Sequence, residues 1–177
     1  MNAPALVSEA RVSDTGARGD LHLFAFFHLN LAFSSIEEER RGEVIARCYW
    51  PLLKLAERHV IGMEISGYTL EEIAARDPAW IARARELIAA ARIELIGSGY
   101  SQMIGPLVPA RVTAENLRLG LSAYQEFLGC RPRLALVGEQ AYSAGLAAGG
   151  GAADGGVAAE VAAAFFSTIR TAMIEPS

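Results

Sequence analysis

The chain has 177 residues, of which 52% are hydrophobic and 20% are charged, and its formal net charge at pH 7 is -4. This length supports one domain with a substantial core. The acidic balance provides no basic patch, so neither nucleic acid nor an anionic membrane is expected as a partner. No stretch approaches the roughly 20 apolar residues of a membrane-spanning helix.

The N-terminal segment, residues 1–20, is polar and rich in small side chains. It lacks the apolar core of roughly 7–15 residues that a signal peptide requires, so we expect a flexible tail on a cytoplasmic protein. Cys48 and Cys130 have no CxxC spacing and no further cysteine beside them. They are therefore expected to be reduced packing residues rather than zinc ligands or part of a disulfide framework.

Four short apolar runs, each followed by glycine or polar residues, predict β-strands. They span residues 21–27, 60–65, 93–96 and 134–137. The first run is apolar almost throughout rather than alternating, which is typical of a strand covered on both faces in a parallel sheet.

Helix signals fill the intervals between these runs. The expected N-terminal caps are Ser35 and Thr69, each at capping-box spacing from a glutamate (Glu38 and Glu72), Asp77 before Pro78, and Thr113. Pro51 falls inside the first helical pattern and predicts a kink or a break. The last helix should end at Gly129, and its expected inner face comprises Leu117, Gly120, Leu121, Tyr124 and Leu128. This alternation predicts an α/β fold with a parallel sheet or part of a barrel.

The composition changes after Leu146. Residues 147–156 are all alanine or glycine except Asp154, and glycine at this density resists ordering. We therefore expect three segments, which are a flexible tail at residues 1–20, a partial barrel at 21–146, and a low-complexity or out-of-frame tail at 147–177.

Polar side chains gather where each predicted strand ends. His28 and Asn30 follow the first strand, Glu64 and Tyr68 close the second, Tyr100 and Gln102 follow the third, and Glu139 and Gln140 follow the fourth. The carboxyl ends of parallel strands share one edge of a sheet, so these groups should share a cleft.

Each of these residues also has a purely structural interpretation. His28 beside aromatic residues is equally consistent with a hydrogen-bonded core histidine, and Tyr100 and Gln102 could serve only the loop backbone. Glu64 within an apolar run favours function, because a buried carboxylate must be paired or perturbed. Glu139 alone would be a loop acid, and it becomes the favoured candidate because the other strand ends point toward it.

Three ordered motifs, at residues 28–35, 96–109 and 136–143, together resemble the N-terminal part of glycoside hydrolase family 57. The resemblance covers residues 21–146. It implies an incomplete (β/α)7 barrel, with about four βα units, that acts on α-linked glucans by a retaining mechanism. Glu139 is similar in position to the family's nucleophile, and no cofactor is implied.

The chain also departs from the family pattern. The family's first motif more often reads His-Gln-Pro, its second carries a histidine where Gln102 stands, and asparagine would be expected in place of Gly138. These departures suggest a separate branch of the family.

A retaining glycosidase needs two carboxyl groups about 5–5.5 Å apart. The resemblance implies a general-acid aspartate downstream of this chain, and nothing in the sequence gives Glu64 that role. We therefore expect a truncated member, read out of frame after about Leu146, with little or no hydrolase activity. Four strands leave an open edge through which self-association is expected.

Two alternative functions remain open. A metal-dependent polysaccharide deacetylase would use His28, Asn30 and Glu64, but the His-rich set of such a site is missing. A non-catalytic glucan-binding module would use Tyr68, Tyr100 and Tyr142 as stacking platforms for sugars.

Overall fold

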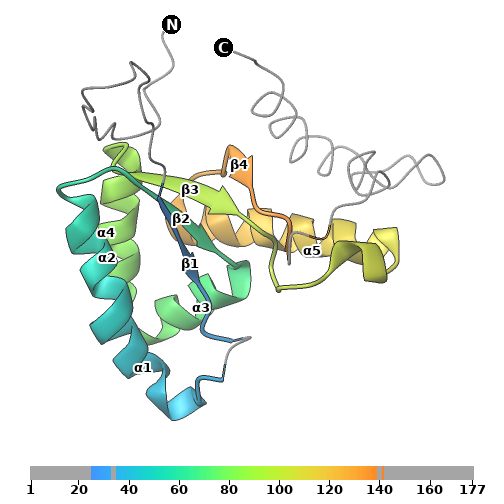
Figure 1. Ribbon diagram of the computed structural model, residues 1–177, viewed down its shortest axis with the longest axis horizontal. Coiled ribbons are helices and arrows are strands. Elements are labelled where there is room, and N and C mark those ends of the chain that lie inside the picture. Colours follow the sequence, from blue (N-terminus) through green and yellow to red (C-terminus); the bar gives the residue numbers. More distant parts are fainter. Residues whose placement is uncertain (1–24, 33–34, 139–140, 142–177) are drawn as a thin grey trace, which may run out of the picture.

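A computed structural model describes residues 25–32, 35–138 and 141 of the chain (Figure 1). Its centre is a four-stranded sheet with the order β1-β2-β3-β4, in which every neighbouring pair is parallel. The strands are β1 (Phe26–Leu29), β2 (Ile61–Ile65), β3 (Ile93–Gly97) and β4 (Leu134–Ala135). The expected α/β class with a parallel sheet is therefore confirmed.

Helices connect the strands (Figure 1). The first connection comprises the short helix η1 (Glu38–Arg40), α1 (Arg41–Val44), the π-turn η2 (Ile45–Tyr49) and α2 (Trp50–Ala56). The second comprises α3 (Gly67–Arg76) and α4 (Pro78–Ala89), and the third comprises η3 (Gly105–Leu107), α5 (Ala110–Ala123) and the π-turn η4 (Tyr124–Leu128). Among the described residues, no helix is long and apolar enough to cross a lipid bilayer.

The strand register assigns the side chains to the two faces of the sheet. His28 pairs with Glu64, and Glu64 pairs with Ile96, so these three residues lie side by side. Side chains alternate along a strand, so Met63 and Ile65 point to the opposite face. That face packs against the helices, because both residues belong to the buried core. His28 and Glu64 therefore lie on the opposite face, which we call the open face because the His28 side chain is 41% exposed there, although Glu64 beside it is buried.

The first strand is shifted relative to the prediction. It spans Phe26–Leu29, so His28 lies inside the strand rather than after it. Pairing with β2 continues to Leu29 and Ile65, both 1% exposed, because their burial extends the ladder beyond the polar histidine. The fourth strand is shorter than expected, since it pairs only with Ile96 and Gly97.

Helix starts were predicted with mixed success. Asp77 caps α4 as expected, and its side chain accepts a hydrogen bond from the Trp80 amide at 3.1 Å. The cap expected at Thr69 is wrong, because Ser66 caps α3 and accepts from the Thr69 amide at 3.2 Å. Gly67 packs closely against Tyr100, which allows the helix to begin at this glycine.

Two other predicted caps are also wrong. The helix expected to begin at Ser35 begins at Glu38, without a side-chain cap. The cap expected at Thr113 lies inside α5, and its hydroxyl contacts the carbonyl of Gly105 instead. Pro109 precedes the first turn of α5, and its fixed φ allows the helix to begin three residues before Thr113.

The interruption predicted at Pro51 is present. The helical segment carries the π-turn Ile45–Tyr49 just before this proline, which lies in the first turn of α2. Proline lacks the N–H that would continue the hydrogen-bond ladder, so the ladder shifts there. The packing role expected for Cys48 is wrong, because this residue of the π-turn is exposed. Cys130 is partly buried, and burial raises the pKa of its thiol.

The predicted boundaries at residues 20 and 146, and the whole Ala/Gly-rich segment, lie outside the described residues. Within the described sheet, β1 and β4 are the edge strands. Self-association through such an edge stays a prediction.

The loop after β3 crosses α5 at very short range. A Cβ atom added to Gly120 would lie 2.5 Å from the carbonyl carbon of Gly99 and 2.8 Å from the amide nitrogen of Tyr100. These neighbours are backbone atoms, so a side chain at position 120 forces the loop away from the helix.

Gly120→Ala is therefore expected to lower the free energy of unfolding by about 1–3 kcal/mol, the usual cost of overpacking. Gly42→Ala is the matched control, because Gly42 is a helical glycine whose added Cβ would meet no described atom within 4 Å outside its own stretch of helix. It should raise the free energy of unfolding by about 0.5–1 kcal/mol through helix propensity. Urea unfolding followed by circular dichroism measures both, and equal effects would contradict the close approach.

Candidate functional site at the carboxyl edge of the sheet

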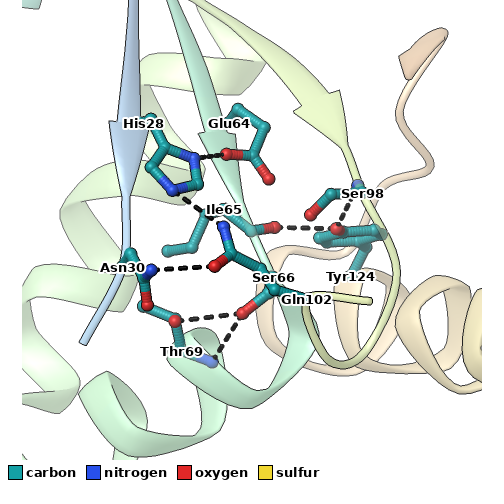
Figure 2. Close-up of polar contacts among 9 residues, drawn as sticks. All are labelled: His28, Asn30, Glu64, Ile65, Ser66, Thr69, Ser98, Gln102 and Tyr124. Carbon is teal, nitrogen blue, oxygen red and sulfur yellow. Dashed lines mark hydrogen bonds and ion pairs between the residues drawn. The ribbon is translucent and has the colours of Figure 1, made fainter. Parts of the chain in front are cut away.

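Four of the predicted site residues lie together at the carboxyl edge of the sheet (Figure 2). His28 and Glu64 come from neighbouring strands, Asn30 follows β1, and Gln102 lies in the loop after β3. Their hydrogen bonds join residues that are up to 74 positions apart in the sequence.

These four side chains form one continuous chain of hydrogen bonds. The Glu64 carboxylate contacts Nδ1 of His28, and Nε2 of His28 lies 2.8 Å from Nε2 of Gln102. At its other end, Oε1 of Gln102 accepts a hydrogen bond from Nδ2 of Asn30 at 2.8 Å. Figure 2 shows this path from Glu64 to Asn30.

The order of donors in this chain assigns the His28 tautomer. Because Oε1 of Gln102 accepts from Asn30, the amide nitrogen of Gln102 faces His28 and donates to it. Nε2 of His28 is then the acceptor, so the ring proton sits on Nδ1 and is donated to Glu64.

Glu64 and His28 differ in how far they are buried, and this difference gives them different roles. The Glu64 side chain is 1% exposed, whereas the His28 side chain is 41% exposed. A carboxylate taken out of water needs hydrogen-bond donors, and the His28 Nδ1–H supplies one. Glu64 therefore orients the imidazole, and the imidazole presents part of its ring to the open face.

Tyr124 links β2 to the segment directly after β3 through two hydrogen bonds. Its side chain is 0% exposed, and its hydroxyl donates to the Ile65 carbonyl at 2.7 Å while accepting from the Ser98 amide at 3.0 Å. Burial is the main cause that raises the pKa of Tyr124 to about 12, and the nearby Glu64 makes a smaller contribution in the same direction. The helical period placed Tyr124 on the inner face of the last predicted helix, but it did not predict this link between β2 and the segment after β3.

The predicted tyrosines form a second group around α3. The rings of Tyr68 and Tyr100 meet edge to face, with centroids 6.0 Å apart and an interplanar angle of 68°. The Tyr100 hydroxyl donates to Glu71, and this hydrogen bond is the main cause that raises the pKa of Tyr100 to about 12. Arg41 hydrogen-bonds both Glu72 and Tyr68, and the bond to Glu72 is the main cause that raises the pKa of Arg41. Polar contacts thus hold both tyrosines.

The remaining predicted residues, Glu139, Gln140 and Tyr142, lie outside the described residues. Gly138 precedes them and packs on the loop that carries Gln102, because a Cβ atom at position 138 would lie 2.6 Å from the Met103 carbonyl oxygen. The asparagine expected at this position would displace that carbonyl. Glycine is therefore required by the close approach of the two segments.

A small pocket of about 40 Å³ lies between this loop, β4 and α5. Its lining includes Ser98, Met103, Asn116 and Gly138. This space fits water rather than a sugar ring, so the open face of the sheet is the better candidate surface for a large ligand. Within the described part of the chain, no group of three or more His, Cys, Asp or Glu side chains could hold a metal ion.

A parallel sheet that gathers polar side chains at the carboxyl ends of its strands defines the barrel-type class of α/β proteins, which build their binding sites at that edge. The comparisons with known proteins agree with this class. The sequence model of glycosyl hydrolase family 57 matches residues 24–156, and the chain belongs to this family.

One similar solved structure is the 4-alpha-glucanotransferase from Thermococcus litoralis, with a TM-score of 0.61 and 18% sequence identity. The match covers 70% of this chain and 20% of that one, so the chain spans about a fifth of its length. This likeness shows the fold, and the expected partial (β/α)7 barrel is confirmed. The search of curated proteins found no match.

Tyr124→Phe is expected to lower the free energy of unfolding at neutral pH by about 1–3 kcal/mol, because Ser98 and Ile65 lose a buried partner. Tyr100→Phe is the control, since its hydroxyl contacts the exposed Glu71 and its loss should cost less. Urea unfolding at neutral pH measures both variants. Equal losses of unfolding free energy would contradict the proposed role of Tyr124 in linking Ile65 to Ser98.

Tyr124→Phe should also change how the free energy of unfolding depends on pH in the alkaline range. The pKa of Tyr124 is raised from 10.0 to about 12, so its stabilising contribution is complete below pH 10 and is lost as pH rises toward 12. Between these values the unfolded chain releases a proton that the folded chain keeps, and stability falls by about 1.4 kcal/mol per pH unit. Tyr124→Phe should remove this part of the slope.

Proposed function

We propose that the carboxyl edge of the sheet binds an α-linked glucan, and that the chain is part of a retaining glycoside hydrolase or transglycosidase. The observation that carries this proposal is the hydrogen-bonded chain from Glu64 through His28 and Gln102 to Asn30. It lies inside the region that matches the family, and a solved structure with the same fold is named a 4-alpha-glucanotransferase.

The chemistry of this edge suits a sugar. An amide nitrogen carries two hydrogens, and His28 takes one from Gln102, so the second can be donated to a sugar hydroxyl. The imidazole of His28 is 41% exposed on the open face and offers a flat ring for the apolar side of a pyranose. A combined polar and apolar surface of this kind is typical of ligand sites.

For the reaction, we propose Glu139 as the nucleophile that attacks the anomeric carbon. A retaining mechanism also needs a second carboxyl group that protonates the leaving oxygen. Glu64 is buried and bound to His28, so we assign it to orienting the ring and not to acid catalysis. We therefore propose that the chain by itself binds glucan with little or no turnover.

Gln102→Ala is expected to weaken binding of a maltooligosaccharide by about tenfold, because the proposed donor is lost and His28 loses its partner. Gln125→Ala is the matched control, since Gln125 is an exposed glutamine in η4 and should leave affinity unchanged. Isothermal titration calorimetry measures both variants against the unchanged chain. Identical affinities for the two variants would rule out the proposed binding edge.

A second experiment addresses Glu139 without depending on the general acid. 5-Fluoro-α-glucosyl fluoride needs no protonation of its leaving group, because the C–F bond breaks with departure of fluoride as a carboxylate oxygen bonds to C1. The expected result is a mass increase of one fluoroglucosyl unit, which peptide mapping places on Glu139. Glu139→Gln should abolish the label, and Glu126→Gln, an exposed glutamate in η4, should keep it. Labelling that persists in Glu139→Gln would end the nucleophile assignment.

A further inference from the structure

We propose that Asn116 is a positioning residue for glucan binding, which holds the loop after β3 so that Gln102 reaches His28. This inference rests on the proposed binding edge, and it assigns a role to a residue of α5 that hydrogen-bonds Ser101, the residue directly before Gln102. The sequence pattern gave it no role, because Asn116 stands next to Leu117 on the buried face of a regular helix.

The asparagine binds the loop as a neighbouring strand would. Its Oδ1 accepts from the Ser101 amide at 2.8 Å and from the Ser101 hydroxyl at 3.1 Å, and its Nδ2 donates to the Ser101 carbonyl at 3.0 Å. Its own backbone carbonyl accepts from the Tyr100 amide at 2.9 Å. Both backbone groups of the residue directly before Gln102 are therefore satisfied by one side chain.

The contact between Asn116 and the loop is buried, and it requires a glycine at position 99. Asn116 is 7% exposed, and a buried amide without partners would be costly. Gly99 has a φ of +128°, and a Cβ atom there would lie 2.5 Å from Nδ2 of Asn116. Together with the close approach at Gly120, this glycine lets the loop reach the asparagine.

Other contacts hold the first part of the same loop. The Gly67 amide donates to the Gly99 carbonyl at 2.9 Å, and the Tyr68 amide donates to the Tyr100 carbonyl at 2.8 Å. These bonds end one residue before Ser101. Loss of the Asn116 side chain should therefore release Ser101 and Gln102 while the start of the loop stays attached to α3.

The experiment compares Asn116→Ala with Asn116→Asp and with Ser122→Ala, an exposed control on the same helix. The first readout is long-range 1H–15N correlation of the imidazole rings, in which the chain's three histidines are assigned with the help of His28→Gln. The second readout is maltooligosaccharide affinity. Circular dichroism and thermal melting verify that each variant is folded.

Asn116→Ala should move the Nε2 signal of His28 toward its position in Gln102→Ala and weaken binding by about tenfold. Asn116→Asp keeps the acceptor for the Ser101 amide but lacks the donor for its carbonyl, so smaller changes are expected in both readouts. Ser122→Ala should match the unchanged chain. A purely structural role would lower the melting temperature without moving the His28 signal in the folded protein.

An unchanged His28 signal together with unchanged affinity in folded Asn116→Ala would overturn the proposal. If that variant does not fold, Asn116→Asp decides by the same two readouts. If the unchanged chain binds no maltooligosaccharide but the His28 signal still moves, the proposed function fails while the positioning of Gln102 stands.

Discussion

The buried carboxylate of Glu64 is the constraint on which the edge of this sheet depends. At 1% exposure it cannot be left without donors, and the register places His28 directly beside it on the neighbouring strand. The Nδ1–H of His28 donates a hydrogen bond to Glu64. Nε2 of His28 is therefore an acceptor, and the side-chain amide of Gln102 donates to it. One buried side chain thus determines the tautomer of a histidine and the hydrogen-bond partner of a loop residue.

The residues of this edge come from segments that are far apart in the sequence. Their relative positions therefore depend on other residues that hold these segments together. Tyr124 joins β2 to the end of β3, and Asn116 holds the loop that follows. Both residues belong to the segment of α5 and η4, which packs on the face of the sheet away from His28. The helical segment therefore acts on the site through the backbone of the loop.

The sequence predicted what local physics controls and missed what tertiary contacts decide. Apolar runs located all four strands, and Asp77 before a proline identified a true cap, because both signals act over a few residues. The cap at Ser66 was missed because the choice between it and Thr69 depends on Gly67 packing against a loop from elsewhere. Of the candidate site, the sequence predicted which residues gather at this edge, but it did not predict which of them hydrogen-bond to one another. Asn116 was missed for the same reason, since its partner Ser101 becomes a neighbour only in the folded chain.

Two of the departures from the expected family pattern meet at one hydrogen bond. Asn30 stands where the first family motif more often has proline, and Gln102 stands where the second has histidine, yet these two side chains hydrogen-bond each other at 2.8 Å. Proline has no side-chain donor, so it could not make this bond. Glutamine carries a donor and an acceptor on one planar group, which allows it to bridge Asn30 and His28 at once. In this chain both side chains are needed to complete the hydrogen-bonded path that begins at Glu64.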